Sequence, residues 1–342
     1  MSSLSTSHSR CNINDITGHK ITIFVSLEHK NIKKLSVGKI LAYDIMPSNI
    51  TFSEEEIMKS SRIVCAFVML LLLGFNGRIA HADQLNLAIM EDMSGAAKKY
   101  APLIGYLKNK GIEVTLIEVP AYTVAAQTFA SGKVDAMFSG SGIAGTMIIK
   151  GVANPVVRPL DKEGISTYSA TIVAPKGSPK FTGSADYFKG KKVIFASLAS
   201  AGEFYFYSIP NIASVNAIKL PVPSHGYALE ALSHGGGEVA IVKNRVWDKM
   251  KDKYLQLEAV GEDKGENPDN TLIVSVKTNK DTITKLAQAL LTLKDDNSPQ
   301  AQSVRDQMNI QGYIKTTSAD FKHTFELLKK AGVDQSFNFA FK

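Results

Sequence analysis

The stretch Tyr122-Thr-Val-Ala-Ala-Gln-Thr-Phe-Ala-Ser-Gly-Lys-Val-Asp-Ala-Met-Phe-Ser-Gly-Ser-Gly142 contains one unit of an alternating α/β fold. Its first ten residues, 122–131, read as a helix that Gly132 ends, and residues 134–138 read as a short, mostly apolar strand. A helix predicted over 142–150 follows, and Gly151 ends it. This succession favours a sheet with parallel strands and helices covering its faces.

The same rhythm extends in both directions from this stretch. A strand over 85–89, a helix over 94–109 and a strand over 114–119 precede it. A β-rich run over 167–175 follows and is long enough to pass between two lobes. Beyond it we expect strands over 192–195, 217–222, 238–242 and 271–277, and helices over 202–208, 226–233, 281–293, 299–308 and 318–331. Ligands of open α/β sheets bind at the carboxyl ends of strands, so two such lobes would form a cleft between their loops.

Residues 58–82 have the three parts of a secretory signal peptide. They comprise a basic start, an unbroken apolar run over 63–73 and the cleavage pattern Ala80-His81-Ala82. A transmembrane helix needs about 20 apolar residues, so a cleaved signal is favoured over an uncleaved anchor or a buried helix. Because such a signal normally begins a chain, we expect residues 1–57 to be a non-native or disordered extension. A genuine extension is the alternative.

The composition argues against a protein that depends on disulfides and against one that binds nucleic acid. Cys11 and Cys65 are the only cysteines among 342 residues, and cleavage after Ala82 would remove both. The roughly 260 residues that remain can bury a core without disulfides. The net charge of +7 is dispersed and forms no basic block, so we expect no binding of nucleic acid.

Two loops rich in Ser and Gly are the strongest candidates for a binding site. Phe138-Ser139-Gly140-Ser141-Gly142 and Ser197-Leu198-Ala199-Ser200-Ala201-Gly202 each follow a predicted strand and open a helix. The N–H groups of a helix N-terminus attract an anion, serine hydroxyls add donors, and glycine permits close approach. The alternative is that both loops only cap their helices. Their spacing matches neither a Walker loop nor a dinucleotide fingerprint.

Other polar residues follow predicted strands. Tyr122, His225 and Asn244 lie at positions that can face a cleft, although each alone is typical of a capping or surface residue. Glu91-Asp92 suits either a ligand's ammonium group or the N-terminus of the next helix, and we favour the helix. The histidines lack metal-ligand spacing and no serine lies in a nucleophile elbow. We therefore expect no metal, no cofactor and no catalytic residue.

Taken in order, these motifs resemble the periplasmic phosphate/phosphite/phosphonate-binding family of ABC transporters, a branch of the type II solute-binding proteins. The resemblance covers residues 84–333. It is carried by the run 122–135, the two Ser/Gly loops, the segment Ser224–Leu232 and the ending from Gly312-Tyr313 through 327–332. It implies an α/β fold of the two-lobed type II periplasmic binding protein kind. Each lobe would be a mostly parallel sheet flanked by helices, joined by crossover strands.

The resemblance also implies a division into lobes and a set of ligand-binding residues. Lobe 1 would comprise 83–172 and 271–342, and lobe 2 would comprise 173–270. The implied ligand-binding residues are Tyr122, Ser139, Gly140 and Ser141 in lobe 1 and Ser197, Ser200, Ala201, Gly202, His225 and Asn244 in lobe 2. Ala201 departs from the family, whose second-lobe loop carries a denser cluster of hydroxyls. This departure weakens the expectation of a free phosphonate ligand.

The function implied is that of a monomeric periplasmic protein that binds a small anionic ligand and delivers it to an ABC permease in the inner membrane. Closure of the two lobes around the ligand would be the mechanism. Two other functions stay open at this point. One is a ligand-sensing domain of a signalling system, and the other is a secreted serine-dependent hydrolase.

Overall fold

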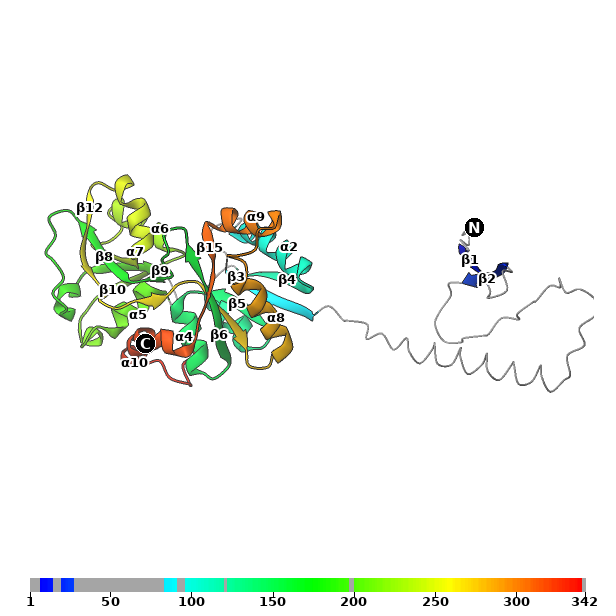
Figure 1. Ribbon diagram of the computed structural model, residues 1–342. Coiled ribbons are helices and arrows are strands. Elements are labelled where there is room, and N and C mark those ends of the chain that lie inside the picture. The colour runs from blue at the N-terminus through cyan, green and yellow to red at the C-terminus, as the bar shows by residue number, and fades with distance from the viewer. Residues whose placement is uncertain are drawn as a thin grey trace, which may run out of the picture. The chain divides into compact units, whose positions relative to one another are not determined.

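The computed structural model describes residues 7–14, 20–27, 83–90, 96–119, 122–196 and 200–339 (Figure 1). The chain divides into two compact units, Met1–Arg78 and Ile79–Lys342. In the first unit, strands β1 (Ser7–Asn14) and β2 (Lys20–Leu27) pair in antiparallel. The predicted signal peptide over 58–82 lies outside the described residues and stays a prediction. None of the helices described is long and apolar enough to cross a membrane.

The second unit contains a six-stranded sheet, which we call, with its helices, lobe 1. Its strands are β3 (Asp83–Met90), β4 (Ile112–Val119), β5 (Ala136–Ser139), β6 (Ala153–Asp161), β14 (Thr271–Ser275) and β15 (Ile310–Lys315). They lie in the order β15-β6-β14-β5-β3-β4. Strand β3 pairs in parallel with β4 and β5, as the α/β rhythm predicts. Strand β14 is antiparallel to both β5 and β6, and β15 is antiparallel to β6.

Helices cover both faces of this sheet. They are α2 (Ala101–Asn109), α3 (Tyr122–Ala130), α4 (Ser141–Ile149), α8 (Lys280–Leu291), α9 (Pro299–Met308) and α10 (Lys322–Lys330), with the 3-10 turns η1 (Ala96–Tyr100) and η5 (Ser318–Phe321). Helices α2, α8 and α9 bury their apolar residues in one core, while α3, α4 and α10 form the other. Because successive strand side chains point to opposite faces, Phe138 belongs to the first core and Met137 to the second.

The second sheet has five strands and, with its helices, forms lobe 2. Its elements are β8 (Ala170–Pro175), β9 (Lys192–Ala196), β10 (Ile218–Val222), β11 (Val239–Lys243), β12 (Leu257–Glu262), α5 (Ala201–Ser208), α6 (His225–Ser233), α7 (Asn244–Met250), η2 (Ala185–Phe188), η3 (Ile212–Ser214) and η4 (Lys251–Lys253). The strand order is β10-β9-β11-β8-β12. Strands β9, β10 and β11 are parallel, and β8 and β12 add antiparallel strands at one side. Figure 1 shows the two sheets side by side.

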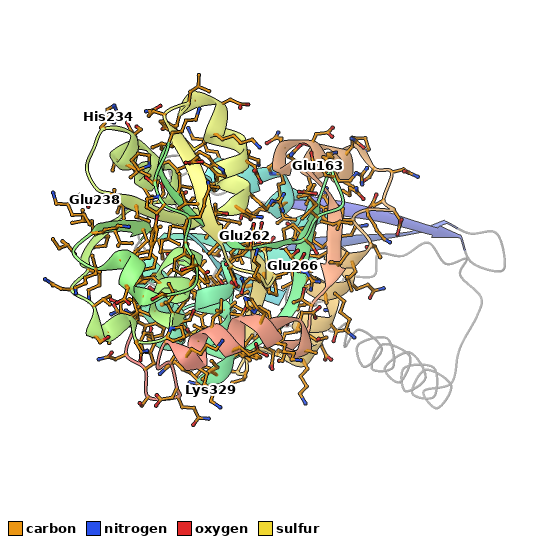
Figure 2. All side chains as sticks on the ribbon, turned by 90° about the vertical axis from the view of Figure 1, so that its left-hand side faces the viewer. Glu163, His234, Glu238, Glu262, Glu266 and Lys329 are labelled. Atoms are coloured by element: carbon orange, nitrogen blue, oxygen red, sulfur yellow. The ribbon has the colours of Figure 1, made fainter. Side chains whose placement is uncertain are left out.

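Two crossovers connect the lobes. Strands β7 (Thr167–Tyr168) and β13 (Asn267–Pro268) lie within them and pair with each other in antiparallel. The second crossover runs from Glu262, the last residue of β12, to Thr271, the first residue of β14. Glu262 and Glu266 are labelled in Figure 2. Since β8 pairs with β11 from Ala170 onward, residues 170–172 lie in the sheet of lobe 2, whereas the sequence prediction ended lobe 1 after residue 172.

Three strands of the two large sheets were not expected from the sequence, namely β6, β12 and β15. Strand β6 contains Pro155 and Pro159, which argue against a central strand because proline lacks an N–H donor. The ladder tolerates them through irregular register on both sides of β6. Strand β12 is likewise interrupted by a register shift at Gly261, and β15 by one at Gly312. Such irregular strands lack the clean alternation that identifies a strand in sequence.

Candidate functional site

The carboxyl ends of β4 and β5 and the N-termini of α3 and α4 lie at one edge of the lobe 1 sheet. Ser139 ends β5 and is only 4% exposed, and Gly140 occupies the N-cap position of α4, where no side chain caps the helix. The hydroxyl of Ser141, the first residue of α4, lies 2.5 Å from the hydroxyl of Tyr168 on the first crossover. Tyr122 begins α3 after β4, two strands away from β5 in the sheet. The first-lobe residues predicted from sequence therefore meet at one edge.

Lobe 2 presents a matching edge at the carboxyl ends of β9, β10 and β11. Ser200 is the N-cap of α5, and its hydroxyl accepts the N–H of Glu203 at 3.2 Å. Ala201 is the first residue of α5, and Gly202 packs its backbone against β11. His225 and Asn244 begin α6 and α7. Ser197 lies outside the described residues.

Asn244 is engaged in holding the crossover. Its side-chain oxygen accepts the N–H groups of Ser169, at 3.2 Å, and of Arg245, at 2.8 Å. Its own N–H donates to the carbonyl of Ser169 at 2.9 Å. Asn244 and Ser141 are thus both hydrogen-bonded to the first crossover through their side-chain oxygens.

A few buried polar atoms in the described part of the chain have no hydrogen-bond partner. They are Ser139 Oγ, Tyr187 OH, His225 Nδ1 and Thr271 Oγ1. An unpaired buried polar group costs about 1–3 kcal/mol, so proteins rarely retain one without a reason. Three of these four atoms lie at the facing edges of the two lobes, on β5, α6 and β14. This concentration distinguishes these two edges from the rest of the described structure.

His225 supplies a neutral group to this cleft. Although part of the residue is exposed, its Nδ1 is fully covered. Burial lowers the pKa of His225 to about 3; the charge of Lys243 lowers it further, and Asp269 opposes both effects. The imidazole is therefore neutral near pH 7. It can hydrogen-bond a ligand, but it does not contribute a positive charge.

An ion-pair network, which no local sequence pattern predicts, lies where the crossovers meet lobe 2. Arg245 of lobe 2 pairs with Asp161 at the end of β6, and also with Asp269 on the second crossover at 3.4 Å. Lys243 pairs with the same Asp269 and lies 4.5 Å from the ring centre of Tyr168. Burial raises the pKa of Tyr168 well above its usual value, so the phenol stays neutral. The network connects both crossovers to lobe 2.

The carboxylate of Asp161 gives this network a pH dependence. Burial alone would raise its pKa, but N–H donors from Ile165 at 2.7 Å and Glu163 at 3.0 Å, together with Arg245, outweigh burial and lower it. The pKa of Asp161 is lower in the folded protein than its value of about 3.9 in the unfolded chain, so the ionised carboxylate stabilises the folded protein at pH values above about 3.9. This stabilisation is lost as the pH falls through the pKa of the folded protein.

We therefore expect the stability difference between the wild type and Asp161→Asn to shrink as the pH is lowered from about 6 to about 3. Urea unfolding at several pH values in that range measures it. Asp248→Asn is the control, because Asp248 pairs with Lys251 where both side chains are at least half exposed, so this pair contributes little to stability. A wild-type advantage over Asp161→Asn that stays constant across the range would contradict the assigned linkage.

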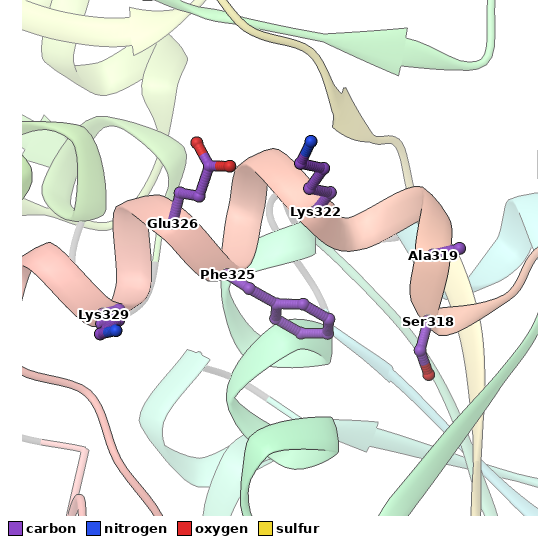
Figure 3. Close-up of a pocket in the computed structure, with 6 residues that line it drawn as sticks. All are labelled: Ser318, Ala319, Lys322, Phe325, Glu326 and Lys329. Carbon is purple, nitrogen blue, oxygen red and sulfur yellow. The ribbon is translucent and has the colours of Figure 1, made fainter.

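A shallow hollow of about 470 Å³ lies elsewhere, on the surface of α10 (Figure 3). It is lined by Ser318, Ala319, Lys322, Phe325, Glu326 and Lys329. It contains none of the residues predicted from sequence and none of the unpaired buried atoms. The chemistry therefore favours the inter-lobe edges over this hollow. Among the residues described, no group of three or more His, Cys, Asp or Glu side chains is arranged to hold a metal ion.

Comparison with known proteins decides the family. The model of a family described as "ABC transporter, phosphonate, periplasmic substrate-binding protein" matches residues 88–321. The chain belongs to this family. Members of the phosphonate substrate-binding family are extracytoplasmic binding components of transporters. No curated protein sequence matches the chain.

Solved structures of similar fold include members of the same class. XAC2383 from Xanthomonas citri, bound to ATP, has 16% identity and a TM-score of 0.62, covering 73% of this chain and 97% of that one. PhnD1 from Prochlorococcus marinus, in complex with methylphosphonate, has 17% identity and a TM-score of 0.60, covering 73% and 99%. A binding protein component of an ABC phosphonate transporter from Pseudomonas aeruginosa (PA3383) has 16% identity and a TM-score of 0.58, covering 73% and 87%. At such identities the likeness shows the fold, which is the predicted type II periplasmic binding protein architecture.

Proposed function

We propose that this chain is the solute-binding component of an ABC importer and that it captures a small phosphate- or phosphonate-like oxyanion by closure of its lobes. Membership of the phosphonate substrate-binding family supports the transport role. PhnD1, whose fold is similar, was solved with methylphosphonate, a ligand of this class. The proposed site and the closure rest on this chain's own residues.

The unpaired buried atoms at the facing edges carry the proposal. Ser139 Oγ of lobe 1 and His225 Nδ1 of lobe 2 are both covered and both lack partners among the described residues. Each costs free energy in the empty protein, and a ligand between the lobes would supply the missing hydrogen bonds. The N-termini of α4 and α5 lie beside them and favour a negative charge. The ligand that best suits these donors is an oxyanion.

Contact between the lobes supports closure. Phe204, on α5 of lobe 2, is 2% exposed and lies in the lobe 1 core that contains Ala144 and Phe321. Helix α5 thus packs against both α4 and α10. A ligand that contacts Ser139 and Ser200 together binds only this closed arrangement, so binding shifts the open–closed equilibrium toward it.

Secretion and docking complete the proposal. Strand β3 begins at Asp83, one residue after the predicted cleavage point at Ala82. Cleavage there would leave the whole lobe 1 sheet intact, and the mature protein would act as a monomer that delivers its ligand to a permease in the inner membrane.

The test is ligand binding by protein that has been unfolded and refolded to remove any bound solute. Methylphosphonate, phosphite and inorganic phosphate are the probes, with sulfate as an oxyanion that lacks phosphorus. We expect at least one phosphorus probe to raise the free energy of unfolding, by about 2.7 kcal/mol at 100 times its dissociation constant. Ser139→Ala and Ser200→Ala should each weaken binding of that probe by about tenfold or more.

Measuring the stability of these variants distinguishes a loss of ligand binding from a loss of folding. Ser200 caps α5, so Ser200→Ala should also lose about 1 kcal/mol of stability. Ser298→Ala is the matched control, because Ser298 caps α9 through the N–H of Ala301 at 3.2 Å and lies away from the cleft. It should lose similar stability and keep its affinity. If no phosphorus probe stabilised the wild type, the proposed ligand class would be wrong.

A further inference from the structure

Thr271 occupies a special position in the fold. It is the first residue of β14, where the chain re-enters lobe 1 from the second crossover. Since β14 runs antiparallel to β5, its first residue lies beside the last residue of β5. Thr271 is therefore placed at the same edge of the sheet as the carboxyl ends of the parallel strands, which is where α/β sheets bind ligands.

Thr271 and Ser139 form a cross-strand pair. They are direct partners in the β14–β5 ladder, and Thr271 is 0% exposed while Ser139 is 4% exposed. Directly opposite residues have Cβ atoms about 4.5–5.5 Å apart on the same face of the sheet, so two hydroxyls in this position reach one common atom. Alternation along β14 puts Thr271 on the face of Ile273, in the core that also contains Ile143 of α4.

Neither hydroxyl has a hydrogen-bond partner within the described part of the chain. The oxygen atoms Ser139 Oγ and Thr271 Oγ1 are both buried and unpaired. Valine has nearly the shape of threonine, and at position 271 it would avoid the free-energy cost of burying an unpaired hydroxyl. A threonine that is fully buried, unpaired and opposite an unpaired serine indicates a shared partner that is not among the described residues.

We propose that Thr271 and Ser139 together form a two-hydroxyl subsite that donates two hydrogen bonds to one oxygen of the bound oxyanion. The inference rests on the proposed function and adds to it a contact from the crossover strand. Hydroxyls are neutral donors, and α4 begins two residues after Ser139 without a side-chain cap. The subsite therefore binds the oxygen-bearing head of the ligand, and its organic substituent lies elsewhere in the cleft.

Thr271→Val tests the subsite by calorimetry with methylphosphonate and with inorganic phosphate. We expect Thr271→Val to raise the dissociation constant of whichever probe the wild type binds by about five- to tenfold, whereas Thr271→Ser stays within about twofold. The ligand-free melting temperature of Thr271→Val should equal or exceed that of the wild type, because the hydroxyl it removes is unpaired. Thr271→Val combined with Ser139→Ala should be less than additive, since both hydroxyls bind one oxygen.

Thr146→Val is the matched control. Thr146 is also 0% exposed in lobe 1, but its hydroxyl donates to the carbonyl of Gly142 at 2.8 Å. This variant should lose stability and keep its affinity. Unchanged affinity in Thr271→Val alongside weakened binding in Ser139→Ala would overturn the subsite, and a buried water would then be the shared partner. Failure of both probes to bind the wild type would overturn the proposed function, and the subsite with it.

Discussion

A Gly202→Ala variant is expected to lose about 3 kcal/mol of unfolding free energy and most of its ligand affinity. A Cβ at this position would lie 2.2 Å from the carbonyl oxygen and 2.9 Å from the carbonyl carbon of Ile241. Both atoms are backbone of β11, a central strand of the lobe 2 sheet, so they cannot move aside as a flexible side chain would. Relief requires α5 to shift away from β11. Because Ser200 caps that helix, the shift would also displace the donors that we propose lobe 2 offers to the ligand.

Urea unfolding and titration with the binding probe measure the two effects. Gly105→Ala is the matched control, since Gly105 also lies within a helix but a Cβ there meets nothing within 4 Å. It should stabilise the protein by about 0.5–1 kcal/mol, because alanine favours helix over glycine. Wild-type stability in Gly202→Ala would mean that α5 is not held against β11 at this residue.

The role of Gly202 shows how far sequence reasoning reaches. A loop rich in Ser and Gly between a strand and a helix predicts both the cap at Ser200 and a close approach of backbone. The parallel strands β3, β5, β9 and β11 were predicted for a similar reason, because a short apolar run between helices has few alternatives. The local sequence pattern was therefore enough to predict the parallel strands at the centre of each sheet and the N-termini of the helices that follow them.

Residues that connect the crossovers to the lobes carry no local signal in the sequence. Asp161 and Asp269 appear in the sequence as ordinary loop carboxylates, and Lys243 and Arg245 as solvated charges. Only the pairing of the two crossovers brings them together. The contact between Thr271 and Ser139 likewise depends on β14 inserting between β5 and β6, which links residues more than a hundred positions apart. The residues of the candidate site that directly follow a strand in sequence were therefore predictable. The residues that the second crossover and β14 bring to the site were not.

Arg245 is the residue of this ion-pair network whose loss should be most costly. It is 20% exposed and pairs with Asp161 and Asp269, whose side chains are 9% and 13% exposed. Lys243 would continue to neutralise Asp269 after Arg245→Met, but Asp161 would retain only its N–H donors. Removing one partner of a buried ion pair costs about 3–5 kcal/mol because the other charge is left uncompensated. We expect about 3 kcal/mol, at the lower end, because Arg245 is partly exposed.

Urea unfolding of Arg245→Met near pH 7 measures this loss, and Lys251→Met is the control. Lys251 pairs with Asp248 at 3.4 Å, with both side chains at least half exposed, so its loss should cost less than about 0.5 kcal/mol. Adding Asp161→Asn to Arg245→Met should restore part of the stability, because the isolated carboxylate is then gone. A double variant no more stable than Arg245→Met would show that the cost comes from the lost packing of the arginine stem. In that case the ion pairs would not be what holds the crossovers to lobe 2.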